Sequence, residues 1–244
     1  MRRGNFRRTA GRGGVAGILV TPATIFGSSL SWFLTADTGY DGTTWTDQSG
    51  TGDSNKDAVG VGTEKPALNT SNSNFNGQRT LDWDGTNDRM VTGTWSSGPS
   101  QPFTTFVVAR IASQPGGANT YLLAGLTDPP MAATYGDQPS LLVRINAGAN
   151  VVGGAYTTAA FVVVSVFNGA SSKIFVSART PVTGDAGAQN PAGFTLGDYP
   201  TTNALFRLNG SIAQCGLVTG AITDAKAAEY LAYAGSKYAI AIGA

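Results

Sequence analysis

The chain alternates short apolar runs with clusters of Gly, Ser, Thr and Asn, and this pattern predicts β-strands joined by turns. The most apolar run covers residues 161–167 and leads into Asn168-Gly169, a dipeptide preferred in hairpin turns, before residues 173–176 return. Residues 103–111 are apolar on both faces until Arg110, as a central sandwich strand would be. Further strands are predicted at residues 121–126, 141–145, 194–197 and 210–218. Short, regularly spaced strands with turn signals indicate an all-β sandwich or barrel.

One helix is predicted near the end of the chain. Thr223 can cap its first turn, and five residues that follow fall at helical spacing on one face. They are Ala227, Tyr230, Leu231, Ala234 and Tyr238. We therefore predict a single domain over residues 29–244, with a long polar stretch from about residue 37 to 76, preceded by an arm of residues 1–28.

The amino-acid composition agrees with a turn-rich β protein and excludes several kinds of catalytic site. Of 244 residues, 33 are Gly and only 13% are charged, which suits short strands with many turns. The chain has no His, so Ser-His-Asp and Cys-His catalytic arrangements are excluded. Its one cysteine, Cys215, lies in an apolar stretch and is predicted to be a buried thiol.

The basic charge of the chain is concentrated in the arm. Five of the sixteen basic residues precede the first acidic residue, Asp37, and the rest of the chain is mildly acidic. Residues 15–20 are apolar, but Thr21-Pro22 ends this run before it reaches the length of the apolar region of a signal peptide. No apolar segment of the chain reaches the ~20 residues that span a bilayer. We therefore expect no membrane association and a partner-binding arm. Its candidate contact residues are Arg2, Arg3, Arg7, Arg8, Arg12, Ile18, Leu19, Val20 and Phe26.

Several segments resemble, in the same order, the concanavalin A-like lectin/glucanase superfamily in its laminin-G-like form, which is common in phage and bacterial surface proteins. They are Leu30–Asp37, Trp45-Thr46-Asp47-Gln48-Ser49-Gly50, Leu81–Asp88, Asn209–Gln214 with Gln where Glu is usual, and Thr223-Asp224 followed by Leu231–Tyr238. The resemblance implies an antiparallel jelly-roll β-sandwich with an extended N-terminal arm and one short C-terminal helix.

Glycanases of that superfamily place paired carboxylates on one strand, and this chain lacks such a pair. Its only glutamates are Glu64, in the polar stretch, and Glu229, on the predicted helix. Asp82 and Asp84 share a strand face, but Asp84-Gly85 is typical of a turn. We therefore expect no enzymatic activity.

Two kinds of ligand site are compatible with the sequence. Asp82, Asp84 and Asp88 supply oxygen ligands of the kind that calcium prefers, although Asp residues also cap turns; we expect no other cofactor. Trp95, followed by a polar turn, and Trp45 are candidates for stacking on a sugar ring. Core packing is the alternative, and the favoured one for the tryptophans as a set.

The expected function is that of a non-enzymatic phage virion structural protein. It would be a capsid decoration protein (a cement protein or head fibre) or a tail component, assembled in the host cytoplasm. Its arm would bind the major capsid protein or another virion protein, and it could self-associate. The alternative is a carbohydrate-binding adhesin or receptor-binding module that recognises glycans. Nucleic acid is the less favoured partner, because the body is acidic and carries no nucleic-acid motif.

Overall fold

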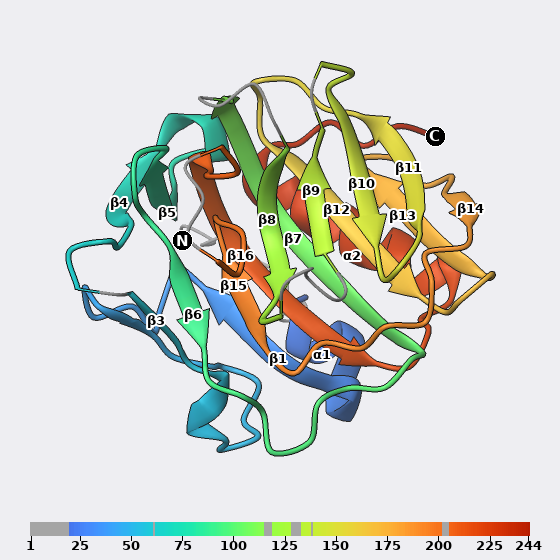
Figure 1. Cartoon of the computed structure of the whole chain (residues 1–244). Helices are drawn as coiled ribbons and strands as arrows, with labels where there is room; N and C mark the ends of the chain where they lie inside the picture. The colour runs from blue at the N-terminus through green and yellow to red at the C-terminus, as the bar shows by residue number, and fades with distance from the viewer. Residues whose placement is uncertain (1–19, 61, 115–118, 128–132, 138, 202–204) are drawn as a thin grey trace, which may run out of the picture.

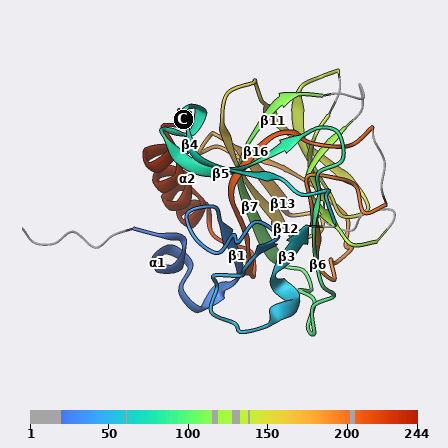
Figure 2. The ribbon, with the colours of Figure 1, turned by 90° about the vertical axis from the view of Figure 1, so that its left-hand side faces the viewer.

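The computed structural model describes residues 20–60, 62–114, 119–127, 133–137, 139–201 and 205–244. Two eight-stranded sheets, in which every strand pairing is antiparallel, lie face to face (Figure 1). A C-terminal helix, α2 (Asp224–Tyr238), and a short helix, α1 (Pro22–Phe26), lie on the outer side of one sheet (Figure 2). The predicted sandwich is confirmed. No described helix is both long enough and apolar enough to cross a bilayer.

Sheet A is the sheet that the helices cover. Its central strand, β16, pairs through its first half with β5 and through its second half with β1, while β7 runs along its other side. In spatial order the strands are β14 (Val182–Gly184), β13 (Ser172–Val176), β12 (Phe161–Phe167), β7 (Phe103–Ser113), β16 (Asn209–Thr219), β5 (Gln78–Asp84) and β4 (Ala67–Asn72), with β1 (Leu30–Thr35) beside β16.

Sheet B faces the viewer in Figure 1. Its strands are shorter, and the helices leave its outer face uncovered. In spatial order they are β11 (Asn150–Ala155), β10 (Leu142–Asn146), β9 (Ala133–Gly136), β8 (Thr120–Gly125), β15 (Phe194–Leu196), β6 (Met90–Thr92), β3 (Ala58–Gly60) and β2 (Thr44–Trp45). Three single 3-10 turns complete the elements, at Gly27–Ser29, Ser54–Lys56 and Ser73–Phe75.

The inner core lies between the two sheets. Alternate residues of each strand point into it, so β7 contributes Val107 and Ala109 while β12 contributes Val163. Cys215 is also buried there, as predicted, and burial raises the pKa of its thiol.

An outer core lies between sheet A and the helices, and it explains why β7 and β12 are apolar on both faces. Phe106 of β7 contacts Tyr230 of α2 and Phe26 of α1, with ring centroids 4.6 and 5.5 Å apart. The predicted helix is confirmed: Thr223 caps it, and its five predicted apolar residues are all buried. Gln214 satisfies the tyrosine hydroxyls in this core, because its amide donates to Tyr230 and its carbonyl accepts from Tyr238.

The predicted arm ends earlier than residue 28. Thr21 caps α1, and Ile25 and Phe26 are buried in the outer core. Phe26 was expected to bind a partner, but its ring is already packed against Phe106 and Tyr230. The described part of the folded body therefore includes residues 21–28, which the sequence assigned to the arm.

Candidate functional site

A β-bulge in β8 builds the centre of the outer face of sheet B. The pairing of β8 with β9 shifts register between Tyr121 and Leu123, so Leu122 and Leu123 both point into the inner core. Tyr121 and Ala124 consequently lie on the outer side, although strict alternation would separate them. The bulge thus puts one aromatic ring and one small residue side by side on the exposed face of this sheet.

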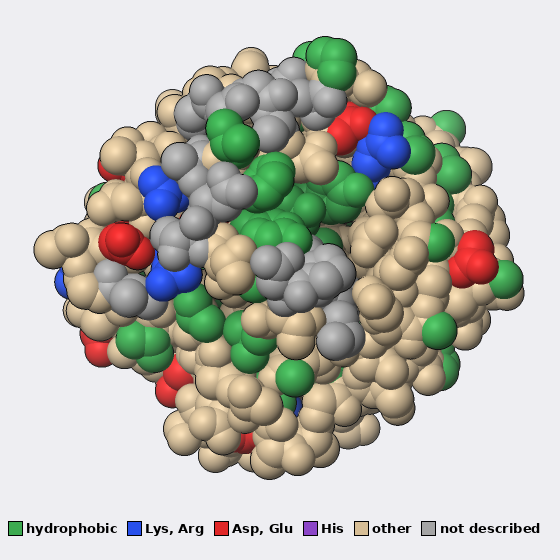
Figure 3. All heavy atoms as spheres, in the orientation of Figure 1, with side chains coloured by type: hydrophobic (Ala, Val, Ile, Leu, Met, Phe, Trp, Pro, Cys, Tyr) green, Lys and Arg blue, Asp and Glu red, His purple; other side chains and the backbone are tan. Residues whose placement is uncertain are grey.

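Four aromatic residues gather at this point, and we call them the aromatic cluster: Tyr121, Tyr135, Tyr199 and Phe206. Tyr121 of β8 stacks on Tyr135 of β9 at 5.0 Å, and it meets Tyr199 and Phe206 edge-on at 5.2 and 5.7 Å. Tyr121 and Tyr135 are only 8% and 6% exposed, whereas Tyr199 and Phe206 are half-buried. Figure 3 shows hydrophobic side chains grouped on the face of the molecule over β8 and β9.

Tyr199 and Phe206 belong to the connection between β15 and β16. Two backbone hydrogen bonds hold the ends of this connection, one to β8 and one between its first and last residues. The N–H of Tyr121 donates to the carbonyl of Phe206 at 3.2 Å, and the N–H of Leu208 donates to that of Gly197 at 2.8 Å. Gly197 adopts φ +76°, and a Cβ at this position would lie 2.2 Å from Nε1 of Trp83. Only glycine fits this turn, which aims the two aromatic residues back over the sheet.

Polar side chains border the aromatic cluster on the β9–β11 side. The hydroxyl of Tyr135 and the amide of Asn146 both donate to Oδ1 of Asn150 at 2.9 Å. Arg144, directly opposite Tyr135 in the strand pairing, donates from Nε to Asp137 at 2.6 Å. Burial raises the pKa of Tyr135 above its ordinary value.

A second group of charged residues lies beside Tyr199 and Phe206. Asp198 is fully buried, and its Oδ2 lies 3.5 Å from Nε of Arg207. Arg89 also acts on Asp198 electrostatically, and its Nε forms an ion pair with Glu64 at 3.4 Å. Burial outweighs both arginines and raises the pKa of Asp198 to about 6.

This arrangement combines ring faces with fixed hydrogen-bonding groups. Partly exposed aromatic rings provide flat apolar contact area, and the surrounding amide, guanidinium and carboxylate groups can orient a ligand that carries many hydroxyls. The sequence analysis missed the aromatic cluster, because its members come from β8, β9 and a connection some 65 residues downstream of β9. No local motif marks them.

The two tryptophans predicted as sugar-stacking residues are buried. Trp45 is 0% and Trp95 4% exposed. Trp95 packs against Trp32 and Phe194 at 5.6 and 5.5 Å, and the ammonium of Lys56 lies over its ring. Neither indole is therefore placed to stack on a sugar ring, and core packing, which the sequence favoured for the tryptophans, is confirmed for both.

The three aspartates proposed for calcium each have a structural role. Asp82 accepts hydrogen bonds from Asn69 and Thr80 of neighbouring strand positions. Asp84 caps its turn by accepting from the N–H of Thr86, as the Asp84-Gly85 pattern predicted, and Asp88 accepts from the N–H of Asp84. Within the described part of the chain no three acidic or thiol side chains are grouped to hold a metal.

Most of the predicted contact residues of the arm, Arg2, Arg3, Arg7, Arg8, Arg12, Ile18 and Leu19, lie outside the described residues. Val20 is described, and its side chain is 47% exposed beside α2.

Comparison with known proteins identifies the fold. No family model matches the chain, and its sequence matches no curated protein. Trypanosoma rangeli sialidase in complex with sialic acid matches 92% of this chain with a TM-score of 0.61 and 17% identity, and the chain covers 36% of that protein. Domain 4 of the arabinanase AbnA from Geobacillus stearothermophilus, in complex with arabinotriose, matches 83% of this chain and 98% of its own length, with a TM-score of 0.59 and 12% identity.

The receptor-binding domain of botulinum neurotoxin type G is a third match, with a TM-score of 0.57 and 10% identity over 84% of this chain and 51% of that one. At such identities the likeness shows the fold alone. The chain is an antiparallel jelly-roll β-sandwich, and the matches fit the concanavalin A-like fold that its sequence motifs resemble.

Proposed function

We propose that this chain is a carbohydrate-binding module and that the outer face of sheet B, around the aromatic cluster, receives a sugar chain. The observation that carries the proposal is the aromatic cluster on this face, with half-buried Tyr199 and Phe206 beside fixed amide and guanidinium groups. Sugar rings have apolar C–H faces that pack on aromatic rings, and hydroxyls that need hydrogen-bond partners. Asn146, Asn150 and Arg144 offer those partners.

The structural neighbours support this choice over a purely structural role. One of them is a single domain of an arabinanase in complex with arabinotriose, and nearly its whole length matches this chain. Another is a toxin domain that binds a receptor. The jelly roll is therefore used by similar domains for recognition, and the aromatic cluster gives this chain a surface suited to it.

The test is glycan binding by the full chain, first on a glycan array and then by titration calorimetry with the best ligand. We expect Tyr199→Ala and Phe206→Ala each to weaken binding tenfold or more, because truncating an aromatic anchor costs about 2 kcal/mol or more and about 1.4 kcal/mol is a factor of ten in affinity. Tyr233→Ala, on α2 at the opposite side of the molecule, is the matched control and should bind normally. Absence of binding by the native chain, or equal affinities for all variants, would overturn the proposal.

We propose as a second candidate function that the module belongs to a phage virion and attaches to it through its basic arm. The fold allows attachment through the arm, because the chain enters the body at α1, on the outer side of sheet A, whereas the aromatic cluster lies on sheet B (Figure 2). An arm attached to a particle would leave the aromatic cluster exposed. Co-sedimentation with particles lacking the protein, over a salt series, tests this: the full chain should bind in a salt-sensitive way and a deletion of residues 1–19 should not.

A further inference from the structure

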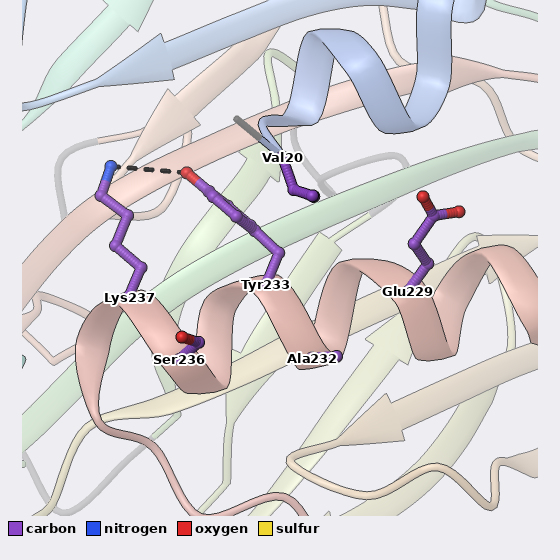
Figure 4. Close-up of a pocket in the computed structure, with 6 residues that line it drawn as sticks. All are labelled: Val20, Glu229, Ala232, Tyr233, Ser236 and Lys237. Carbon is purple, nitrogen blue, oxygen red and sulfur yellow. Dashed lines mark hydrogen bonds between the residues drawn. The ribbon is translucent and has the colours of Figure 1, made fainter. Parts of the chain in front are cut away.

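A groove runs along one side of α2, apart from the face that the helix buries. It encloses about 500 Å³ and is lined by Val20 and by five residues of the helix. Those five are Glu229, Ala232, Tyr233, Ser236 and Lys237, which follow one another at intervals of three, one, three and one and so form a continuous stripe. Figure 4 shows Val20 across the groove from this stripe.

The wall of the groove is apolar and held in place. The Tyr233 ring lies 5.9 Å from the buried ring of Tyr230, and its hydroxyl contacts Oε1 of Gln214 and Nζ of Lys237, each at 3.4 Å. Burial raises the pKa of Tyr233. The small side chains of Ala232 and Ser236 are exposed and leave room beside this ring for another chain segment.

We propose that this groove binds the apolar strip Val15–Leu19 of the same chain. The strip ends one residue before Val20, which already forms part of the groove, so binding needs no association between molecules. Its length is sufficient: the stripe from Glu229 to Lys237 extends about 12 Å along the helix, and five extended residues reach up to about 17 Å.

The composition of the strip suits the groove as well. Val15, Ile18 and Leu19 would bury apolar side chains against Tyr233 and Ala232, and Gly17 allows a close approach of the backbone. Glu229 lies at one end of the groove, where its carboxylate accepts from Lys226 at 2.8 Å and can also accept from a basic residue that precedes the strip, of which Arg12 is the nearest. Bound in this way, the strip would fix the point from which the five arginines of the arm leave the body, independently of whether the chain binds sugars.

The test is NMR on the full chain with labelled methyl groups in Ile18 and Leu19. We expect nuclear Overhauser effects between these methyl groups and the Tyr233 ring. They should disappear in Ala232→Glu, which places a carboxylate in the groove at an exposed position, and remain in Ala225→Glu, the same exposed substitution on the same helix outside the groove. Unchanged resonances elsewhere in the spectrum would show that both variants are folded.

A mixed sample identifies the source of the strip. Half of the molecules carry labelled methyl groups and the other half carry labelled tyrosine rings, so that only contacts between two copies give a signal. The proposal predicts no signal from this sample. Methyl-to-ring contacts in the mixed sample, or none within the uniformly labelled native chain, would overturn it, as would contacts that persist in Ala232→Glu.

Discussion

Asp198 is the residue whose replacement tests the electrostatics of the site most directly. Its carboxylate is fully buried directly after β15, where Oδ1 accepts the N–H of Tyr199 at 2.7 Å. Arg207 and Arg89 favour the ionised form, but desolvation is the larger effect and raises the pKa of Asp198 from 3.8 to about 6. Asp198→Asn keeps the shape of the side chain and removes its ability to ionise.

The size and the sign of the effect of Asp198→Asn on the free energy of unfolding follow from this pKa. Between pH 3.8 and about 6 the folded carboxyl keeps a proton that the unfolded chain has lost. The folded state therefore binds more protons, and its stability falls as pH rises through this window. Above pH 6 the ionised Asp198 costs about 3 kcal/mol, at about 1.4 kcal/mol for each pKa unit between the two states. We expect Asp198→Asn to exceed the native chain in stability by about this amount at pH 8, and to match it near pH 4.

Urea unfolding of both proteins from pH 4 to pH 8 measures this difference. Subtracting the two stability curves cancels the contributions of every other titrating group, so the pH dependence that remains belongs to Asp198. The reasoning is refuted if the difference is the same at all pH values, or if the native chain gains stability relative to the variant as pH rises from 4 to 6.

Three further substitutions test the framework around the site. Gly197→Ala should lower the melting temperature and quench or shift Trp83 fluorescence. The φ of +76° at Gly197 disfavours any other residue, and a Cβ there would lie 2.2 Å from Nε1 of Trp83. An unchanged melting curve would contradict the role of this turn. Phe106→Ala should cost about 3–5 kcal/mol in urea unfolding by opening the outer core, and a loss below 1 kcal/mol would show that α2 packs independently of it. Thr223→Ala should cost about 1 kcal/mol through loss of the cap, with Thr180→Ala, at an exposed position outside the helices, as the comparison.

The sequence predicted the elements whose hydrophobic pattern is long and consistent. The strand at residues 103–111 is β7, extended by two residues, and the run at 161–167 is β12 with the same limits. The two-sided apolar character of residues 103–111 indicates a central position in a sandwich. The structure adds the physical reason, which is that the inner core covers one face and the outer core, with α1 and α2, covers the other.

The site could not be predicted in the same way, because it depends on irregular structure. An alternating pattern assigns Tyr121 and Leu123 to one face of β8, and only the bulge separates them. Tyr199 and Phe206 reach the sheet through a turn that depends on the conformation of Gly197. For Trp95 the local sequence pointed the other way. The polar turn after this residue made it a candidate for exposure, but its indole faces inward onto Trp32 and Phe194.

The two sheets separate the surface proposed to bind a ligand from the side on which the N-terminal arm joins the body. The helices cover the middle of the outer face of sheet A, over β1, β7, β12, β13 and β16, and the groove beside Tyr233 lies along one side of α2. No described helix covers the outer face of sheet B, and the bulge, the Gly197 turn and the half-buried rings are all on it. Because the two surfaces lie on opposite layers, an arm attached on the sheet A side would not block a ligand on sheet B. Changes at Tyr199 or Phe206 should therefore alter ligand binding without altering attachment, and changes in the arm should do the reverse.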